Sequence, residues 1–182
     1  MTTSNTLRKH CKWLLIITLF ALGGNVALAA GPKGPNLVEV AIAVNSEGPY
    51  AGAFDTLIAA VQAADPAVVQ TLTGNGQHTV FAPTDSAFLM LGITADNLDD
   101  LLAEGTLTVE GLTDILLYHV THGRRYSGDV LESEQIRMLN RSVVKQAGGV
   151  LTDNQDGMST IIETDVPAAN GVIHAIDAVL LP

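Results

Sequence analysis

The last thirteen residues of the chain, 170–182, read NGVIHAIDAVLLP. In an extended segment successive side chains point to opposite faces, so Val172 and Ile176 share one face while Ile173 and Ala175 share the other. A strand that is apolar on both faces is typical of a strand buried on both sides. We therefore expect a strand within residues 172–181 that is buried on both sides.

Two further motifs precede this stretch. Residues 79–88 read TVFAPTDSAF and residues 117–120 read LYHV. Together and in this order, the three motifs resemble the signature elements of the fasciclin domain family, over residues 36–182. The resemblance implies an α+β fold, a twisted β-sandwich with helices packed along one side. It also implies an adhesion or surface-interaction module rather than an enzyme.

The resemblance implies a structural role for ten residues of the first and last motifs. They are Thr79, Phe81, Pro83, Thr84, Asp85, Phe88, Asn170, Gly171, His174 and Asp177. A Ser–His–Asp site is the catalytic alternative, but His174 and Asp177 fall on opposite faces of the strand, and the sequence has no Gly-x-Ser-x-Gly elbow. We expect no catalytic residues.

In the family, the Tyr-His element and an Asp-Ile pair before it are implicated in integrin-type adhesion. Here these positions are Asp114, Ile115, Tyr118 and His119. His119 shares an apolar helical stripe with Leu112, and a buried imidazole needs partners for both ring nitrogens, so it has a structural alternative: locking the helix to the sandwich. Asp114 and Tyr118 lie on other faces of this helix and remain candidates for recognition.

Arg124 and Arg125 adjoin this element and complete the candidate adhesion surface. They open the segment 124–145, which carries five cations against three acids, a net charge of +2. The functional interpretation is a patch for an anionic partner such as a matrix glycan, and the alternative is a solvated rim of strands and loops.

The first 29 residues are predicted to be a secretory signal peptide. Three cations precede a ten-residue apolar run, Trp13 to Leu22, and Ala27-Leu28-Ala29 supplies small residues for cleavage. Ten apolar residues are too few for a settled membrane span of about 20, although an uncleaved anchor is left open. Residues 30–35 form a Gly/Pro linker before the domain at 36–182. We expect a secreted protein, extracellular or periplasmic.

Composition excludes several classes of function. Cleavage after Ala29 would remove Cys11, the only cysteine, and so exclude disulfides and thiol chemistry. Three of nine cations would leave with the signal, which changes the net charge from −10 to −13. Such a surface repels phosphate backbones, so we expect no nucleic-acid partner.

The remaining pattern predicts helices first and strands later. Asn36 is the expected N-cap of a helix over 37–44, and Phe54, Leu57, Ile58 and Val61 recur on one face of a second helix that ends at Asp65-Pro66. Residues 79–82 are predicted to be a strand, with Thr84 or Asp85 capping the next helix. Further helices are expected at 96–102 and 109–120, and short strands after His119.

Metal sites have weak support. His119 and His122 lack a third ligand for zinc. Residues 152–163 match several positions of a calcium loop, but Thr152 occupies the position of the key carboxylate, and a hairpin turn explains the same residues. We expect no metal and no cofactor. Asn140-Arg141-Ser142 is a glycosylation sequon, which has meaning only in a eukaryotic secretory path.

Three functions follow as hypotheses. The first is a binding module for attachment to a cell-surface or matrix protein or glycan. The second is a soluble carrier of an apolar small molecule of carotenoid or lipid type, which some fasciclin-like proteins are associated with. The third is hydrolytic or metal-dependent catalysis, which lacks a credible set of residues.

Overall fold

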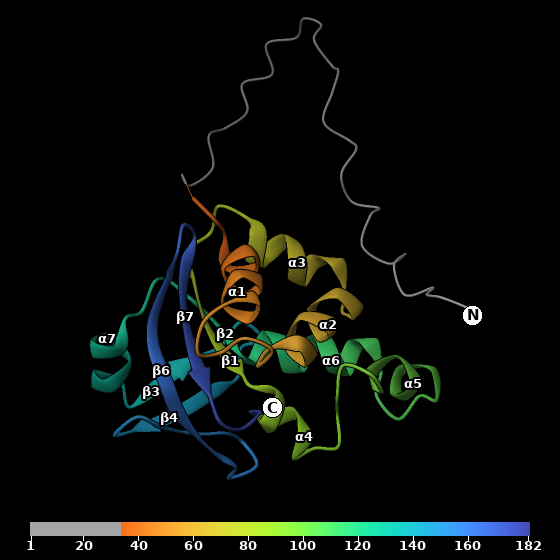
Figure 1. Ribbon diagram of the computed structural model, residues 1–182. Coiled ribbons are helices and arrows are strands. Elements are labelled where there is room, and N and C mark those ends of the chain that lie inside the picture. The colour runs from red at the N-terminus through yellow and green to blue at the C-terminus, as the bar shows by residue number, and fades with distance from the viewer. Residues whose placement is uncertain (1–33) are drawn as a thin grey trace, which may run out of the picture.

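The computed structural model describes residues 34–182 (Figure 1). The expected signal peptide and most of the linker lie outside the described residues. The helices in this range are α1 Leu37–Ser46, α2 Asp55–Ala63, α3 Pro66–Thr73, α4 Asp85–Leu89, α5 Leu98–Ala103, α6 Val109–Tyr118 and α7 Ser127–Glu132. The strands are β1 His78–Pro83, β2 Val120–His122, β3 Gln135–Arg137, β4 Val143–Ala147, β5 Val150–Thr152, β6 Met158–Ala168 and β7 Gly171–Ile176. None of the helices within 34–182 has the length and apolar character that a membrane crossing requires.

Local signals set the helix ends in the first half of the chain. Asn36 caps α1, and its capping box with Glu39 is complete, which confirms the predicted start. Asp65 caps α3 and Pro66 occupies its first turn, so the Asp-Pro pair separates α2 from α3 as expected.

The expected cap of α4 is wrong. Neither Thr84 nor Asp85 makes a side-chain cap bond at that helix. The Asp85 carboxylate instead accepts a hydrogen bond from the backbone N–H of Thr56, at 2.9 Å. It therefore satisfies an amide in the first turn of α2 and joins the two helices.

The strands follow the order β2-β1-β7-β6-β5-β4-β3 in a mixed sheet. β1 and β7 are parallel, and the other neighbours are antiparallel. β6 pairs with β5 at one end and β7 at the other, with register shifts on both sides of Glu163. Such bulges bend a strand and increase its twist. The sheet folds over until a bridge between Thr121 and Met138 links its two ends without closing it.

Two apolar cores lie on opposite faces of the β1–β7 pair. One fills the space between this pair and helices α1 to α6, and includes Leu57, Leu112 and Ile173. The other fills the folded sheet, and includes Phe81 and Ile176. Every residue of β7 is buried, as predicted for a strand apolar on both faces. Figure 1 shows α1 to α6 along one side of the sheet and α7 apart from them. The expected α+β fold is confirmed.

Two predicted elements end earlier in the structure than expected. The helix expected over 109–120 ends at Tyr118, because His119 leaves helical geometry as the C-cap and Val120 begins β2. The strand expected over 172–181 ends at Ile176. Residues beyond it still anchor the chain, since Leu180 is buried in the sheet core.

Candidate functional site

The motif residues join elements that are distant in sequence. Asn170 is fully buried, and its side chain accepts from Leu37 N at 2.8 Å and donates to the carbonyl oxygens of Leu72 (2.7 Å) and Gly74 (2.9 Å). It thereby ties α1 and the end of α3 to the turn between β6 and β7. No backbone partner could serve three such groups at once, which is why a buried amide side chain is useful here.

The other polar motif residues also satisfy backbone groups. Thr79 Oγ1 donates to Gly123 O and accepts from Arg125 N, both at 2.8 Å. His174 stacks on Phe81, with ring centroids 5.6 Å apart. The Asp177 carboxylate accepts from Thr160 N at 2.6 Å. Of the remaining motif positions, Pro83, Thr84 and Phe88 are buried.

His174 belongs to a network that resembles a catalytic triad in composition but not in geometry. Its Nδ1 accepts from the backbone N–H of Asp165 (3.2 Å) and its Nε2 donates to Arg125 O (2.9 Å). Ser127 donates to the Asp165 carboxylate rather than to the imidazole. The histidine therefore has no serine to activate, and the network instead holds the start of α7 against β6 and β7.

His119 is buried with both ring nitrogens occupied. Nδ1 donates to Ile115 O at 2.7 Å, and Nε2 accepts from the backbone N–H of Leu180 at 2.9 Å. Burial lowers the pKa of this imidazole to about 4. His119 is thus a neutral link between α6 and the C-terminal segment, with no free nitrogen for a partner.

The structure corrects the predicted adhesion surface at Tyr118. This side chain is 0 % exposed, lies in the sheet core, and donates its hydroxyl to Val143 O at 3.3 Å. Asp114 is exposed and Ile115 is half-buried on the same helix. The four residues of the Asp-Ile and Tyr-His elements therefore do not form one accessible surface.

Arg124 is half-buried and its guanidinium is held by several acceptors. Nη2 donates to the carbonyl oxygens of Ala168 (2.7 Å) and Ala169 (3.0 Å), and Nε donates to Gln77 Oε1 (3.1 Å). Arg125 is also half-buried, with its backbone N–H bound to Thr79. Reversing the charge of Arg124 would disturb these contacts, so it would not report on attachment alone.

The residues of the two metal alternatives weighed in the sequence take part in other contacts. Asp153 Oδ1 accepts from the N–H groups of Gln155 (2.9 Å) and Gly157 (2.7 Å), so this carboxylate builds the turn between β5 and β6. His122 lies beside His78, with ring centroids 5.6 Å apart, whereas both ring nitrogens of His119 are hydrogen-bonded to backbone groups. Among residues 34–182, no three His, Cys, Asp or Glu side chains gather where they could hold a metal ion.

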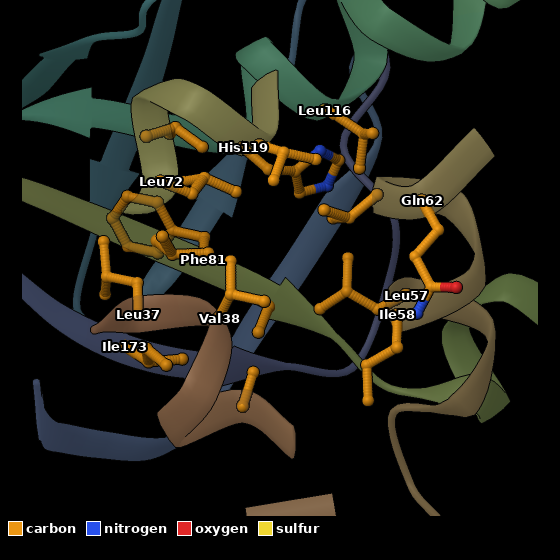
Figure 2. Close-up of a pocket in the computed structure, with 16 residues that line it drawn as sticks. Leu37, Val38, Leu57, Ile58, Gln62, Leu72, Phe81, Leu116, His119 and Ile173 are labelled. Atoms are coloured by element: carbon orange, nitrogen blue, oxygen red, sulfur yellow. The ribbon is translucent and has the colours of Figure 1, made fainter. Parts of the chain in front are cut away.

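An apolar pocket lies between the helices and the β1–β7 pair. Its cavity measures about 100 Å³. Figure 2 shows Leu37 of α1 and Leu72 of α3 on the same side as Phe81 and Ile173, with the α2 side chains of Leu57, Ile58 and Gln62 opposite them. Leu116 and His119 lie along a third side. Gln62 and His119 are the polar residues of its wall, and His119 is already bonded. The pocket therefore suits an apolar group.

A second pocket adjoins the first. Its cavity measures about 20 Å³, and its wall contains Val44, Tyr50, Phe54 and Glu163. The Tyr50 hydroxyl donates to the Glu163 carboxylate at 3.2 Å, which places a polar pair at this end.

The end of α4 carries an exposed apolar tip, Leu89-Met90-Leu91. These side chains are 63 %, 67 % and 43 % exposed, while Phe88 before them is buried. The Asn97 side chain donates to Gly92 O at 2.8 Å and holds the tip against the start of α5. Sequence reasoning missed this tip. Its signal is an apolar run of four residues, longer than one helical face can bury.

Comparisons with known proteins agree with this architecture. A model of the fasciclin domain matches residues 52–182. Protein sll1483 of Synechocystis is 37% identical over 158 residues, which cover 86% of this chain and 79% of that protein. Immunogenic protein MPB70 of Mycobacterium bovis is 35% identical over 164 residues, 85% of this chain and 77% of the relative.

A solved structure shows the same fold. It is a FAS1 domain pair from the insect cell adhesion molecule fasciclin I, with a TM-score of 0.58 and 16% identity, and the match covers 81% of this chain and 51% of that one. The family model covers well over half of the chain, and its three motifs occupy the buried junctions described above. The chain therefore belongs to the fasciclin domain family.

Proposed function

We propose that this chain is an extracellular module that attaches to a protein at a cell surface or in a matrix, and that the apolar tip Leu89-Met90-Leu91 makes the contact. As a fasciclin domain it is a non-catalytic binding module and not an enzyme. The solved structure that it resembles comes from a cell adhesion molecule, which supports the attachment role.

The exposure of the tip is the observation that carries this proposal. Isolated apolar side chains are common on protein surfaces, but three consecutive ones at a helix end form a patch that water solvates poorly. Leucine and methionine side chains pack better against an apolar protein surface than against a sugar ring. The first turn of α5 beside the tip carries Asp99 and Asp100, so a neutral or basic protein partner is favoured.

Replacing Leu89 and Met90 by serine is expected to weaken attachment at least about tenfold, because burying each side chain contributes about 1.5–3 kcal/mol. The measurement is binding of the purified protein to native host cells across a concentration series. Met158→Ser is the matched control, since this methionine is 71 % exposed and belongs to β6, outside the tip. Equal binding by all three proteins would show that the tip is not the contact.

The apolar pocket favours a second function, the carriage of an apolar small molecule. Its walls are almost entirely apolar, and it lies where helices cover a sheet. We expect gently purified protein from the native host to yield about one molecule of an apolar compound per chain on solvent extraction, measured by mass spectrometry. An empty extract from freshly secreted protein would count against carriage.

A further inference from the structure

Two histidines face each other across the first strand pair of the sheet. His78 of β1 lies directly opposite His122 of β2 in the antiparallel register. The backbone N–H of Gly123 donates to Gln77 O, and hydrogen-bonded and non-hydrogen-bonded pairs alternate, so His78 and His122 form a non-hydrogen-bonded pair. Side chains approach each other most closely at such pairs. The two imidazole centroids are 5.6 Å apart, and their planes are inclined at 37°.

The ring of His78 is held in one orientation by the turn before β1. Its Nδ1 lies 3.2 Å from Gly76 O. A carbonyl oxygen can only accept, so Nδ1 carries the proton and Nε2 carries the lone pair. A Cβ atom on Gly76 would lie 2.6 Å from Cε1 of this ring, so the glycine leaves the space that the ring occupies. Metal-binding histidines commonly have this arrangement, with one N–H donated to a carbonyl and the other nitrogen left for the ion.

Both rings have a nitrogen that is open to solvent. Among residues 34–182, Nε2 of His78 has no hydrogen-bond partner, yet every buried side-chain nitrogen or oxygen has one. This nitrogen therefore reaches the surface, although the residue as a whole is only 6 % exposed. His122 is exposed, and its ring makes no hydrogen bond within the same part of the chain. Burial also lowers the pKa of His78, so its ring is neutral at pH 7, as a metal ligand must be.

The separation of the rings suits one shared metal ion. An ion about 2.1 Å from a ring nitrogen lies about 3.2 Å from the centre of that ring, so two rings that share it have centroids at most about 6.4 Å apart. The observed 5.6 Å lies within this limit. The exposed ring of His122 can rotate about its side-chain bonds to direct a nitrogen at the ion, while His78 keeps its place.

A site with two histidine ligands selects among metals. Zinc sites usually have three or four protein ligands, and among residues 34–182 no third His, Cys, Asp or Glu side chain joins this pair to form such a group. Cu²⁺ binds nitrogen ligands more tightly than the other divalent ions of the first row do. It also accepts a tetragonal arrangement of nitrogen and oxygen ligands, in which water can occupy the remaining positions.

We propose that His78 and His122 form a surface site for Cu²⁺, with Nε2 of His78 and one ring nitrogen of His122 as the protein ligands. The site lies where β2 forms the end of the strand order beside β1. It goes beyond both proposed functions, because neither the apolar tip nor the apolar pocket contains these two residues. An ion that binds only the folded chain also stabilises it.

The test is isothermal titration of CuCl₂ into tag-free protein that has been treated with a chelator. We expect one ion per chain, and an electron paramagnetic resonance spectrum with couplings to two imidazole nitrogens. His122→Gln should weaken binding at least about tenfold, because even the loss of an outer-shell partner costs about 10- to 100-fold. His119→Gln is the matched control, since both nitrogens of His119 are used within the fold. Equal Cu²⁺ binding by folded His122→Gln, or no binding by the original protein, would overturn the proposal.

A second variant tests whether the site is built by the turn. Gly76→Ala keeps both histidines but places a Cβ atom against the ring of His78, and we expect a loss of affinity of at least about tenfold. Gly128→Ala is its control, because the added carbon there has nothing within 4 Å. Thermal unfolding without metal verifies that each variant folds. Unchanged affinity in folded Gly76→Ala would show that His78 does not bind the ion from the position described, which would also overturn the proposal.

Discussion

The Gly171→Ala variant is expected to lose more than about 4 kcal/mol of unfolding free energy, enough to abolish folding in a domain of ordinary stability. Gly171 begins β7, directly opposite His78 in the parallel β1–β7 pair. A Cβ atom at this position would clash with the backbone carbonyl oxygen of His78, and it would also lie 3.0 Å from both methyl carbons of Leu37. Backbone in a central strand pair cannot move aside as a flexible side chain can, so the overlap must separate the strands or displace α1.

Chemical denaturation followed by circular dichroism measures this loss. Gly128→Ala is the matched control, because Gly128 lies in α7, is exposed, and has nothing within 4 Å of the added carbon. We expect it to be neutral or to stabilise by up to about 1 kcal/mol, through the higher helix propensity of alanine. A Gly171→Ala protein that unfolds within about 1 kcal/mol of the original would refute this account of the β1–β7 contact.

The α+β fold is predicted by the resemblance of the three motifs to the fasciclin domain family, whereas local signals predict only single elements. The apolar residues on both faces of segment 172–176 indicate a strand covered on both sides, and the Asp65-Pro66 pair indicates a helix break. Both signals act over a few residues, so they can be read without knowledge of the tertiary structure.

The position of Tyr118 could not be predicted in this way. The stripe of Leu112 and Leu116 correctly identifies the face of α6 that packs in the helical core. Tyr118 lies on a different face and enters the sheet core, because the folded sheet covers the C-terminal end of α6 as well. Periodicity identifies an apolar face but does not show that a second layer covers the opposite one.

Long-range polar contacts cannot be predicted from the sequence for a similar reason. The guanidinium of Arg124 is fixed by carbonyl oxygens of residues 168 and 169, which lie 44 and 45 positions away in the chain. Its charge is visible in the sequence, but its partners are not. The apolar pocket is likewise a property of how α1 and α2 pack on β1 and β7, and no single segment encodes it.

The stability of the domain is expected to fall by about 3 kcal/mol between pH 6.5 and pH 4 because of His119. Burial lowers the pKa of its imidazole from 6.5 to about 4 in the folded state, although Asp153 acts in the opposite direction. In this window the unfolded chain binds a proton that the folded chain does not. The contribution of neutral His119 to the free energy of unfolding is therefore fully present above pH 6.5. It is lost as the pH falls, by about 1.4 kcal/mol per pH unit.

The measurement is the free energy of unfolding from denaturant titrations at half-unit steps from pH 8 to pH 4. Burial also lowers the pKa of His78, which adds a smaller loss of the same sign. Partial burial raises the pKa of Asp165, but hydrogen bonds from Ser127 outweigh this and lower it, so the stability due to this carboxylate is lost only below its ordinary pKa of 3.8. The window between pH 6.5 and 4 thus reports mainly on histidine.

Replacing His119 by glutamine separates the two histidines. The variant loses the bonds to Ile115 and Leu180 and should be less stable at pH 8, so the informative quantity is the slope of stability with pH and not its absolute value. We expect most of the slope to disappear in His119→Gln and to persist in His78→Gln. A slope unchanged in His119→Gln would mean that His119 takes up its proton in the folded protein at the same pH as in the unfolded chain. In that case its Nε2 could not accept from Leu180, and the link between α6 and the C-terminal segment would have to be held by other contacts.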